Sequence, residues 1–216
     1  MMLAAERAAI VDCCRRLRAD RLVVGTAGNV SLRVDDLVVV TPTGVDYATL
    51  RPEDVGVHRL DGTPVEAPLA PTSETPMHLA CYAARRTGAV VHTHSTAATA
   101  LSCLVETVPP VHYYLGLFGG RVDVAPYAMY GSPELAENMV TALGDRSACL
   151  LGNHGAVTIG DTLDAAYDRA LYLEYVCDVA LRVLGAGQPP RLLDDTEMAA
   201  ATRRLAGYGQ SGGAQR

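Results

Sequence analysis

The sequence contains no lysine, and all 18 basic side chains among its 216 residues are arginine. A Schiff base through a lysine amine is therefore excluded, and so is the anchoring of pyridoxal phosphate. If this chain performs chemistry on a carbonyl group, that group must be activated in another way. A divalent metal ion is the first alternative.

Excess positive charge and long apolar stretches are also missing. The formal net charge is −6, so the sequence lacks the basic surface that binds nucleic acids or anionic lipids. No apolar run approaches the ~20 residues that cross a bilayer. The first 22 residues mix acidic, arginine and apolar side chains, which is typical of an amphipathic helix and not of a signal peptide. We therefore expect a cytoplasmic protein that binds neither nucleic acid nor membrane.

The cysteines are scattered, and no two of them form a CxxC pair. Most lie in apolar stretches, as reduced core thiols do. A zinc site built on cysteine is therefore not expected. The six residues are Cys13, Cys14, Cys81, Cys103, Cys149 and Cys177.

The length suits a single domain over residues 1–216, with no internal repeat and a glycine-rich tail that we expect to be mobile from about residue 207. Ser73 and Ser132 are the expected N-caps of two helices, each with a proline in the first turn. Interspersed helices and consecutive strands predict an α/β fold of three layers, with helices flanking a mixed or antiparallel sheet. The predicted helices are 3–19, 73–86, 95–104, 132–143, 162–184 and 194–205, and the predicted strands are 37–40, 55–60, 89–94, 122–127, one after the loop at 25–31 and two within 148–160.

Two histidines stand two residues apart at the end of the apolar run AVVHTH, where strand alternation places both on one face. His92 and His94 could be two ligands of one metal ion, and His154, just before a glycine turn, could be the third. Three histidines with an open fourth position are a common catalytic zinc site. The alternative is that these are buried side chains bonded to backbone carbonyls. We interpret His58, His78 and His112 as packing or surface residues.

Glu74 stands at the start of the predicted helix 73–86. Glutamate in a first turn usually compensates the helix dipole, but next to a metal it could act as a general base. It follows the stretch APTS, and the loops GTAGNVS (25–31) and TPTG (41–44) have a similar mixture of small, hydroxyl and amide residues. None is a Walker or Rossmann fingerprint. Together they could bind phosphate through backbone N–H groups, hydroxyls and an amide.

Five motifs, GTAGNVS, TPTG, PTSETPMH, VVHTHS and LLGNHGAV, resemble in order and spacing those of the class II aldolase/adducin-head family, over nearly the whole chain. Within that family they are most similar to the enzymes that cleave L-fuculose 1-phosphate. The resemblance implies the family fold, a central sheet flanked by helices. It also implies one Zn²⁺ per subunit, with Mn²⁺ or Co²⁺ as other divalent ions that imidazole accepts. The family usually forms a homotetramer of fourfold cyclic symmetry with its sites between subunits.

The resemblance also implies roles for individual residues. The metal ligands are His92, His94 and His154. The catalytic residues are Glu74 as acid–base, Tyr113 as proton donor to the aldehyde oxygen in the neighbouring subunit's site, and Tyr208, which closes over the substrate. The phosphate-binding residues are Gly28, Asn29, Thr43, Gly44, Thr72 and Ser73, with Thr26 beside them. The implied reaction is reversible cleavage of a ketose 1-phosphate, L-fuculose 1-phosphate first, to dihydroxyacetone phosphate and L-lactaldehyde.

Other functions within the family stay open. An L-ribulose-5-phosphate 4-epimerase has an aspartate near the place of Tyr113, whereas this sequence has no acidic residue between Glu106 and Asp123. A methylthioribulose-phosphate dehydratase or a deoxypentulose-phosphate aldolase would share the metal and phosphate motifs. The adducin head is a non-catalytic interaction module, for which loss of the metal histidines would be the sign. All three histidines are present here.

Overall fold

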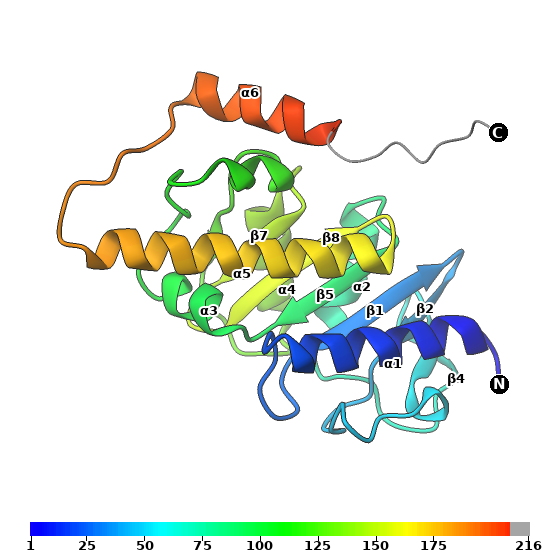
Figure 1. Cartoon of the computed structure of the whole chain (residues 1–216). Coiled ribbons are helices and arrows are strands. Elements are labelled where there is room, and N and C mark those ends of the chain that lie inside the picture. The colour runs from blue at the N-terminus through cyan, green and yellow to red at the C-terminus, as the bar shows by residue number, and fades with distance from the viewer. Residues whose placement is uncertain (208–216) are drawn as a thin grey trace, which may run out of the picture.

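A computed structural model describes residues 1–207 and contains one eight-stranded sheet with helices on both faces (Figure 1). The strand order is β4-β3-β2-β1-β5-β8-β7-β6, and neighbouring strands are antiparallel except β6 and β7. The expected three-layer α/β fold with a mixed sheet is confirmed. The strands are β1 (Asn29–Val34), β2 (Leu37–Val40), β3 (Gly56–Arg59), β4 (Pro64–Glu66), β5 (Ala89–Thr93), β6 (Val124–Ala125), β7 (Ala148–Leu151) and β8 (Gly155–Gly160).

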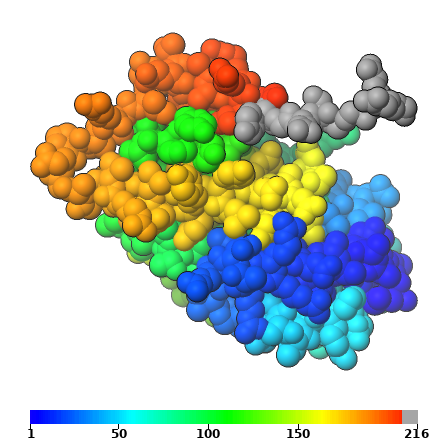
Figure 2. Space-filling view, in the orientation of Figure 1, coloured from blue at the N-terminus to red at the C-terminus, as the bar shows by residue number. Residues whose placement is uncertain are grey.

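The helices form two layers. Helices α1 and α5 lie side by side over one face of the sheet (Figure 2), and α2 and α4 cover the other. None of the helices in the described residues is both long and apolar enough to cross a membrane. They are α1 (Ala4–Ala19), α2 (Thr75–Ala84), α3 (Thr96–Ser102), α4 (Pro133–Leu143), α5 (Leu163–Gly185) and α6 (Asp195–Ala206), with 3₁₀ turns η1 (Pro52–Asp54) and η2 (Tyr113–Phe118).

Successive residues of the central strands pack into different apolar clusters. Val39 and Val91 join the cluster under α1 and α5, whereas Val38 and Val90 join the cluster under α2 and α4. A sheet covered on both faces needs apolar side chains at successive positions of each strand, because they point alternately to the two faces. This explains the continuous apolar runs of the sequence. Five of the six cysteines are buried and Cys103 is exposed, as expected for mostly core thiols.

The expectation that Ser73 caps α2 is wrong. The helix begins at Thr75, and Glu74 occupies the N-cap position without a capping side-chain bond. A turn precedes it, in which the Thr72 hydroxyl accepts from the backbone N–H of Glu74 and Thr75 donates to the Thr72 carbonyl. Ser73 is exposed and free to face a ligand. The other expected cap is confirmed, because Ser132 accepts from the backbone N–H of Leu135 at the start of α4.

Candidate active site

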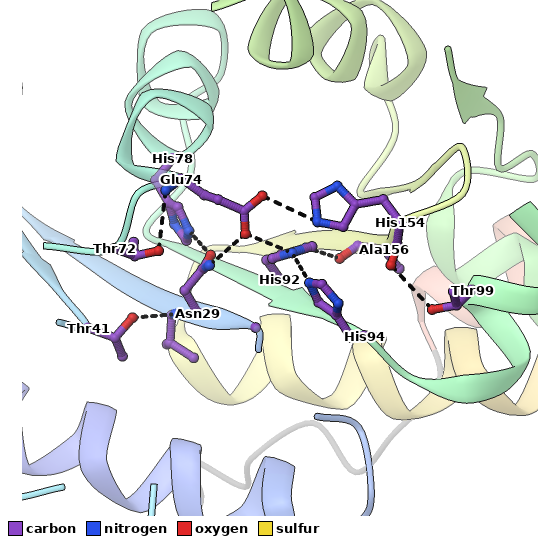
Figure 3. Close-up of polar contacts among 12 residues, drawn as sticks. Asn29, Thr41, Thr72, Glu74, His78, His92, His94, Thr99, His154 and Ala156 are labelled. Atoms are coloured by element: carbon purple, nitrogen blue, oxygen red, sulfur yellow. Dashed lines mark hydrogen bonds and ion pairs between the residues drawn. The ribbon is translucent and has the colours of Figure 1, made fainter. Parts of the chain in front are cut away.

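Three histidines converge from two neighbouring antiparallel strands. His92 lies near the end of β5, His94 just beyond that strand, and His154 in the turn between β7 and β8 (Figure 3). The Nε2 atoms of His92 and His94 are 2.9 Å apart. The three ring centroids lie 4.7, 4.8 and 4.9 Å from one another. The structure thus brings the two neighbouring histidines and the distant one into a single cluster.

Glu74 completes this cluster from the start of α2. One of its carboxylate oxygens lies 3.0 Å from Nε2 of His92 and the other 3.3 Å from Nε2 of His154. The four side chains offer ligand atoms that all lie within 4.8 Å of one another. The side chain of Glu74 is buried, so the charge of its carboxylate is not screened by bulk water.

The hydrogen bonding of His92 makes the cluster suited to a cation. His92 donates from Nδ1 to the backbone oxygen of Ala156 over 2.9 Å, which turns its Nε2, the atom left to coordinate a metal, towards His94 and Glu74. The second oxygen of Glu74 is buried without a hydrogen-bond partner in the described part of the chain. Lone pairs and a carboxylate at these distances need a positive charge among them, either a proton or a metal ion. The donor set of imidazole nitrogens with a nearby carboxylate fits a zinc-type divalent ion.

The burial of these groups favours their metal-binding forms. Burial lowers the pKa of His94 to about 3 and that of His154 to about 4, and the neighbouring His92 adds to both shifts. Neutral imidazole is the form that coordinates a metal. Burial disfavours the ionised form of Glu74, but the histidines and a hydrogen bond from Asn29 outweigh it and lower the pKa of this carboxyl.

Asn29 links Glu74 to a fourth histidine, which lies outside the cluster. The amide nitrogen of Asn29 donates to Glu74 over 2.9 Å, and its oxygen lies 2.5 Å from Nε2 of His78. His78 is fully buried and also contacts Ser31. It is therefore a partner of the candidate site and not simply a packing residue. Its place one helical turn after Glu74 was a usable signal, since side chains four apart share a helix face.

A cavity of about 380 Å³ opens beside the cluster. All six residues that the sequence proposed for phosphate line it, together with Thr26, Glu74, His94 and His154. No arginine is among its lining residues in the described chain. An anionic group there would be held by backbone N–H groups, hydroxyls and an amide. The sequence-proposed lining residues are Gly28, Asn29, Thr43, Gly44, Thr72 and Ser73.

Backbone hydrogen bonds hold the three small-residue loops together. The N–H of Thr43 donates to Ala70 and that of Thr72 donates to Thr41, which joins the loop after β2 to the segment before α2. Gly28 has a φ of +86°, and a Cβ there would overlap Val23. Glycine is therefore the residue that this turn requires.

Sequence reasoning missed the far wall of the cavity. Tyr127, Tyr130 and Asn153 line it, and both tyrosines are mostly exposed. They belong to the segment after β6 and to the turn before His154. Their sequence contexts, APYAMYG and LLGNHG, carry no periodic signal that points to a ligand.

Tyr113 does not reach this cavity within one chain. It lies on η2, is 47% exposed and lines a separate apolar cavity with Tyr114, Tyr172 and Arg204. Any role at the histidine cluster would have to be in another copy of the chain. Tyr208, the other tyrosine proposed from the sequence, lies outside the described residues.

Comparisons with known proteins identify the family and the fold of this chain. The family model for the class II aldolase and adducin N-terminal domain matches residues 8–181. A 5-deoxy-D-ribulose 1-phosphate aldolase of Bacillus thuringiensis serovar kurstaki is 35% identical over 97% of this chain and 100% of its own length. The L-fuculose phosphate aldolase of Escherichia coli is 36% identical over 93% of this chain and 94% of its own. A solved L-fuculose 1-phosphate aldolase superimposes with a TM-score of 0.91 and 33% identity, covering 95% of this chain and 98% of that one.

The chain therefore belongs to the class II aldolase and adducin N-terminal domain family. The resemblance inferred from the five motifs is confirmed, as is the fold that it implied. Relatives named for different substrates are about equally similar to this chain, so the comparisons define the family but not the sugar.

Proposed function

We propose that this protein is a metal-dependent class II aldolase that reversibly cleaves a ketose 1-phosphate to dihydroxyacetone phosphate and an aldehyde. The observation that carries the proposal is the meeting of the Glu74 carboxylate with three imidazole nitrogens at a cavity lined by glycine, hydroxyl and amide residues. The lack of lysine fits, because a Schiff-base aldolase would need one.

His92, His94 and His154 would hold the metal, for which we propose Zn²⁺, with Mn²⁺ or Co²⁺ as substitutes. A divalent ion at this position supplies a Lewis acid that polarises the carbonyl group and stabilises the negative charge of an ionised substrate. The ring of His92 is oriented for this role by its bond to Ala156, as the second nitrogen of a ligating histidine commonly is.

Glu74 would be the group that moves the proton on carbon. In the condensation direction, its carboxylate takes a proton from the hydroxymethyl carbon of dihydroxyacetone phosphate, and that carbon then forms the new bond to the aldehyde carbon. In cleavage, the same carboxyl returns the proton to carbon. Its burial and its hydrogen bond from Asn29 hold it in the cavity wall next to the phosphate loops.

Tyr113 would donate the proton to the aldehyde oxygen at the site of a neighbouring subunit. Tyr113 lies on η2 and lines a different cavity from that of the histidine cluster. This position supports a role in another copy of the chain. We accordingly propose a homotetramer of fourfold cyclic symmetry with sites between subunits. Tyr208 is proposed to close over the substrate. The six free cysteines support a cytoplasmic location.

L-fuculose 1-phosphate is the substrate that we propose first, supported by the solved aldolase with a TM-score of 0.91. A 5-deoxypentulose 1-phosphate is the alternative, supported by the relative from Bacillus thuringiensis serovar kurstaki. The aldehyde halves of the two substrates differ. Tyr127 and Tyr130 line the cavity and are exposed, which supports a role for them in contacting that half.

The test is dihydroxyacetone phosphate release from L-fuculose 1-phosphate and from 5-deoxy-D-ribulose 1-phosphate, with and without a chelator. We expect release that the chelator abolishes and added Zn²⁺ restores, with the higher kcat/KM for L-fuculose 1-phosphate. The Glu74→Gln protein is the background control. A higher kcat/KM for the pentulose would change the substrate. Metal-loaded protein that releases nothing from either would contradict the aldolase proposal and leave the epimerase, the dehydratase or an adducin-like module.

A further inference from the structure

Five polar side chains form a buried hydrogen-bonded chain that leads from the candidate site into the core. Glu74 accepts from Asn29 over 2.9 Å, and Asn29 lies 2.5 Å from Nε2 of His78 (Figure 3). On the other side of the His78 ring, Nδ1 lies 2.7 Å from the hydroxyl oxygen of Ser31. That oxygen lies 2.7 Å from the hydroxyl oxygen of Tyr82. All five residues are at most 5% exposed.

With Glu74 ionised and the His78 ring neutral, only one arrangement of hydrogens satisfies this chain. An ionised Glu74 accepts hydrogen bonds only, so Asn29 must turn its nitrogen to the carboxylate and its oxygen to His78. The oxygen of Asn29 also accepts only, so Nε2 of His78 must carry the proton. Burial lowers the pKa of His78 to about 3, so the ring is neutral and its Nδ1 is an acceptor.

The rest of the chain follows from that tautomer. Ser31 donates its hydroxyl hydrogen to Nδ1 of His78, and the serine oxygen then accepts from Tyr82. Tyr82 is the terminal donor, and each link fixes the direction of the next. A His78 ring with its proton on Nδ1 would place a lone pair against the Asn29 oxygen. Asn29 would then gain by turning that oxygen towards Glu74, where it would repel the carboxylate.

We propose that His78 is a positioning residue that acts on Glu74 through Asn29. Ser31 and Tyr82 hold the ring in the one tautomer that keeps the Asn29 nitrogen facing the carboxylate. The kinetic part of this inference rests on the proposed aldolase function, whereas the tautomer and the amide orientation do not. The side chain of His78 touches neither the cavity nor the three cluster histidines among the contacts of the described residues, so its effect on the site must be indirect.

The kinetic experiment compares His78→Leu with His78→Gln and Ser31→Ala. Leucine is similar in size and removes both bonds, whereas glutamine keeps a donor for Asn29 and an acceptor for Ser31. We expect the leucine variant to bind metal at the wild-type stoichiometry and to lose about 10- to 100-fold in kcat, as partners behind a metal site commonly do. The loss in kcat should exceed the rise in KM, and the glutamine variant should recover most of it.

The Ser31→Ala variant removes only the hydroxyl. It provides the kinetic test if the leucine variant does not fold. Its kcat should fall between those of the wild type and the leucine variant. Wild-type kcat in His78→Leu or in Ser31→Ala would overturn the proposal. Equal losses in the glutamine and leucine variants would do the same, because they would show a packing requirement and not a hydrogen-bonding one.

The second measurement is nitrogen NMR of the full chain with ¹⁵N-labelled histidine, in the metal-free state at pH 7. We expect the His78 ring to carry its proton on Nε2, with Nδ1 as an acceptor whose signal shifts in Ser31→Ala. A proton on Nδ1, or on both nitrogens, would refute the arrangement. This measurement needs no substrate. If the protein cleaves no ketose phosphate, the proposed function is wrong. The spectrum would still show whether His78 donates to Asn29.

Discussion

Asn29 and His92 lie directly opposite each other on the antiparallel strands β1 and β5, and both side chains meet one oxygen of Glu74. Asn29 donates to that oxygen over 2.9 Å, and Nε2 of His92 lies 3.0 Å from it. The register of two strands therefore sets the position of the candidate acid–base. A slip of either strand by one residue would turn its side chain to the opposite face of the sheet and separate the pair.

Replacing His94 with alanine should abolish stoichiometric metal binding while leaving the fold intact. The side chain lies beyond the end of β5 and not in a core layer, and its Nε2 is one of three converging imidazole nitrogens. Elemental analysis after dialysis, with circular dichroism for the fold, is the measurement. His112→Ala is the control, since that ring lies near η2, away from the cluster. Full metal content in the His94 variant would remove the three-histidine site.

Replacing Glu74 with glutamine should keep the metal and lose turnover. Glutamine has nearly the same shape and can still accept from Asn29, but it cannot take a proton from carbon. We expect kcat to fall by about 10²- to 10⁴-fold, the usual contribution of general acid–base catalysis. The more specific measurement is exchange of a carbon-bound hydrogen of dihydroxyacetone phosphate with deuterated water, which should stop. Exchange at the wild-type rate would assign the proton transfer to another group.

The sequence predicted the elements of this fold well because most of them have a single periodicity. The long helix α5 and the apolar strand β5 were both expected close to their observed bounds. The short edge strand β4 was missed. It has only three residues, begins with a proline and pairs irregularly with β3, so neither length nor alternation signals it.

The candidate site was predictable where residue type alone limits the chemistry, and less so where contact decides. His92, His94 and Glu74 carry groups that suggest metal and proton chemistry anywhere. His78 does so too, but its helical context fitted a core residue equally well, and only the contact with Asn29 separates the two interpretations. Tyr127 and Tyr130 line the cavity because β6 ends beside β7. That pairing depends on the tertiary structure and cannot be read from the local sequence.

Mixing two inactive variants should restore activity if Tyr113 serves the site of a neighbouring subunit. The structure places Tyr113 away from the histidine cluster of its own chain, so under this proposal Tyr113→Phe and His94→Ala would damage different chains of one shared site. Co-expressed in equal amounts, they should regain about a quarter of wild-type activity if each site of a ring takes one tyrosine from one neighbour. No recovery, from variants that each assemble normally, would show that Tyr113 does not serve the site of a neighbouring subunit.

Replacing Gly155 with alanine should destabilise the protein and weaken metal binding together. A Cβ there would overlap the backbone oxygen of Thr93 and touch the ring of His92, so β5 and β8 would have to move apart beside His154. We expect a loss of about 1–3 kcal/mol in the free energy of unfolding, the usual cost of overpacking. Gly185→Ala is the control, because nothing lies within 4 Å of a Cβ at the end of α5. Denaturant titration and a metal-binding isotherm measure both effects, and an unchanged isotherm would mean that the cluster tolerates the strain.

Replacing His78 with glutamine should flatten the loss of stability of the metal-free protein on mild acidification. Burial lowers the pKa of His78 from 6.5 to about 3, so the folded state keeps the ring neutral while the unfolded chain gains a proton below pH 6.5. The stabilising contribution of the neutral ring is therefore present above pH 6.5 and is lost as the pH falls towards 3.

Between pH 7 and pH 5.5 only the unfolded state titrates at this position, so the wild type should lose about 1 kcal/mol more than His78→Gln. All other titratable side chains are the same in both proteins, so the difference isolates position 78. Urea denaturation at the two pH values, with a chelator present, measures it. Parallel pH dependence in the two proteins would show that the folded state takes up a proton on this ring as readily as the unfolded chain does, which the arrangement of hydrogens from Tyr82 to Glu74 does not allow.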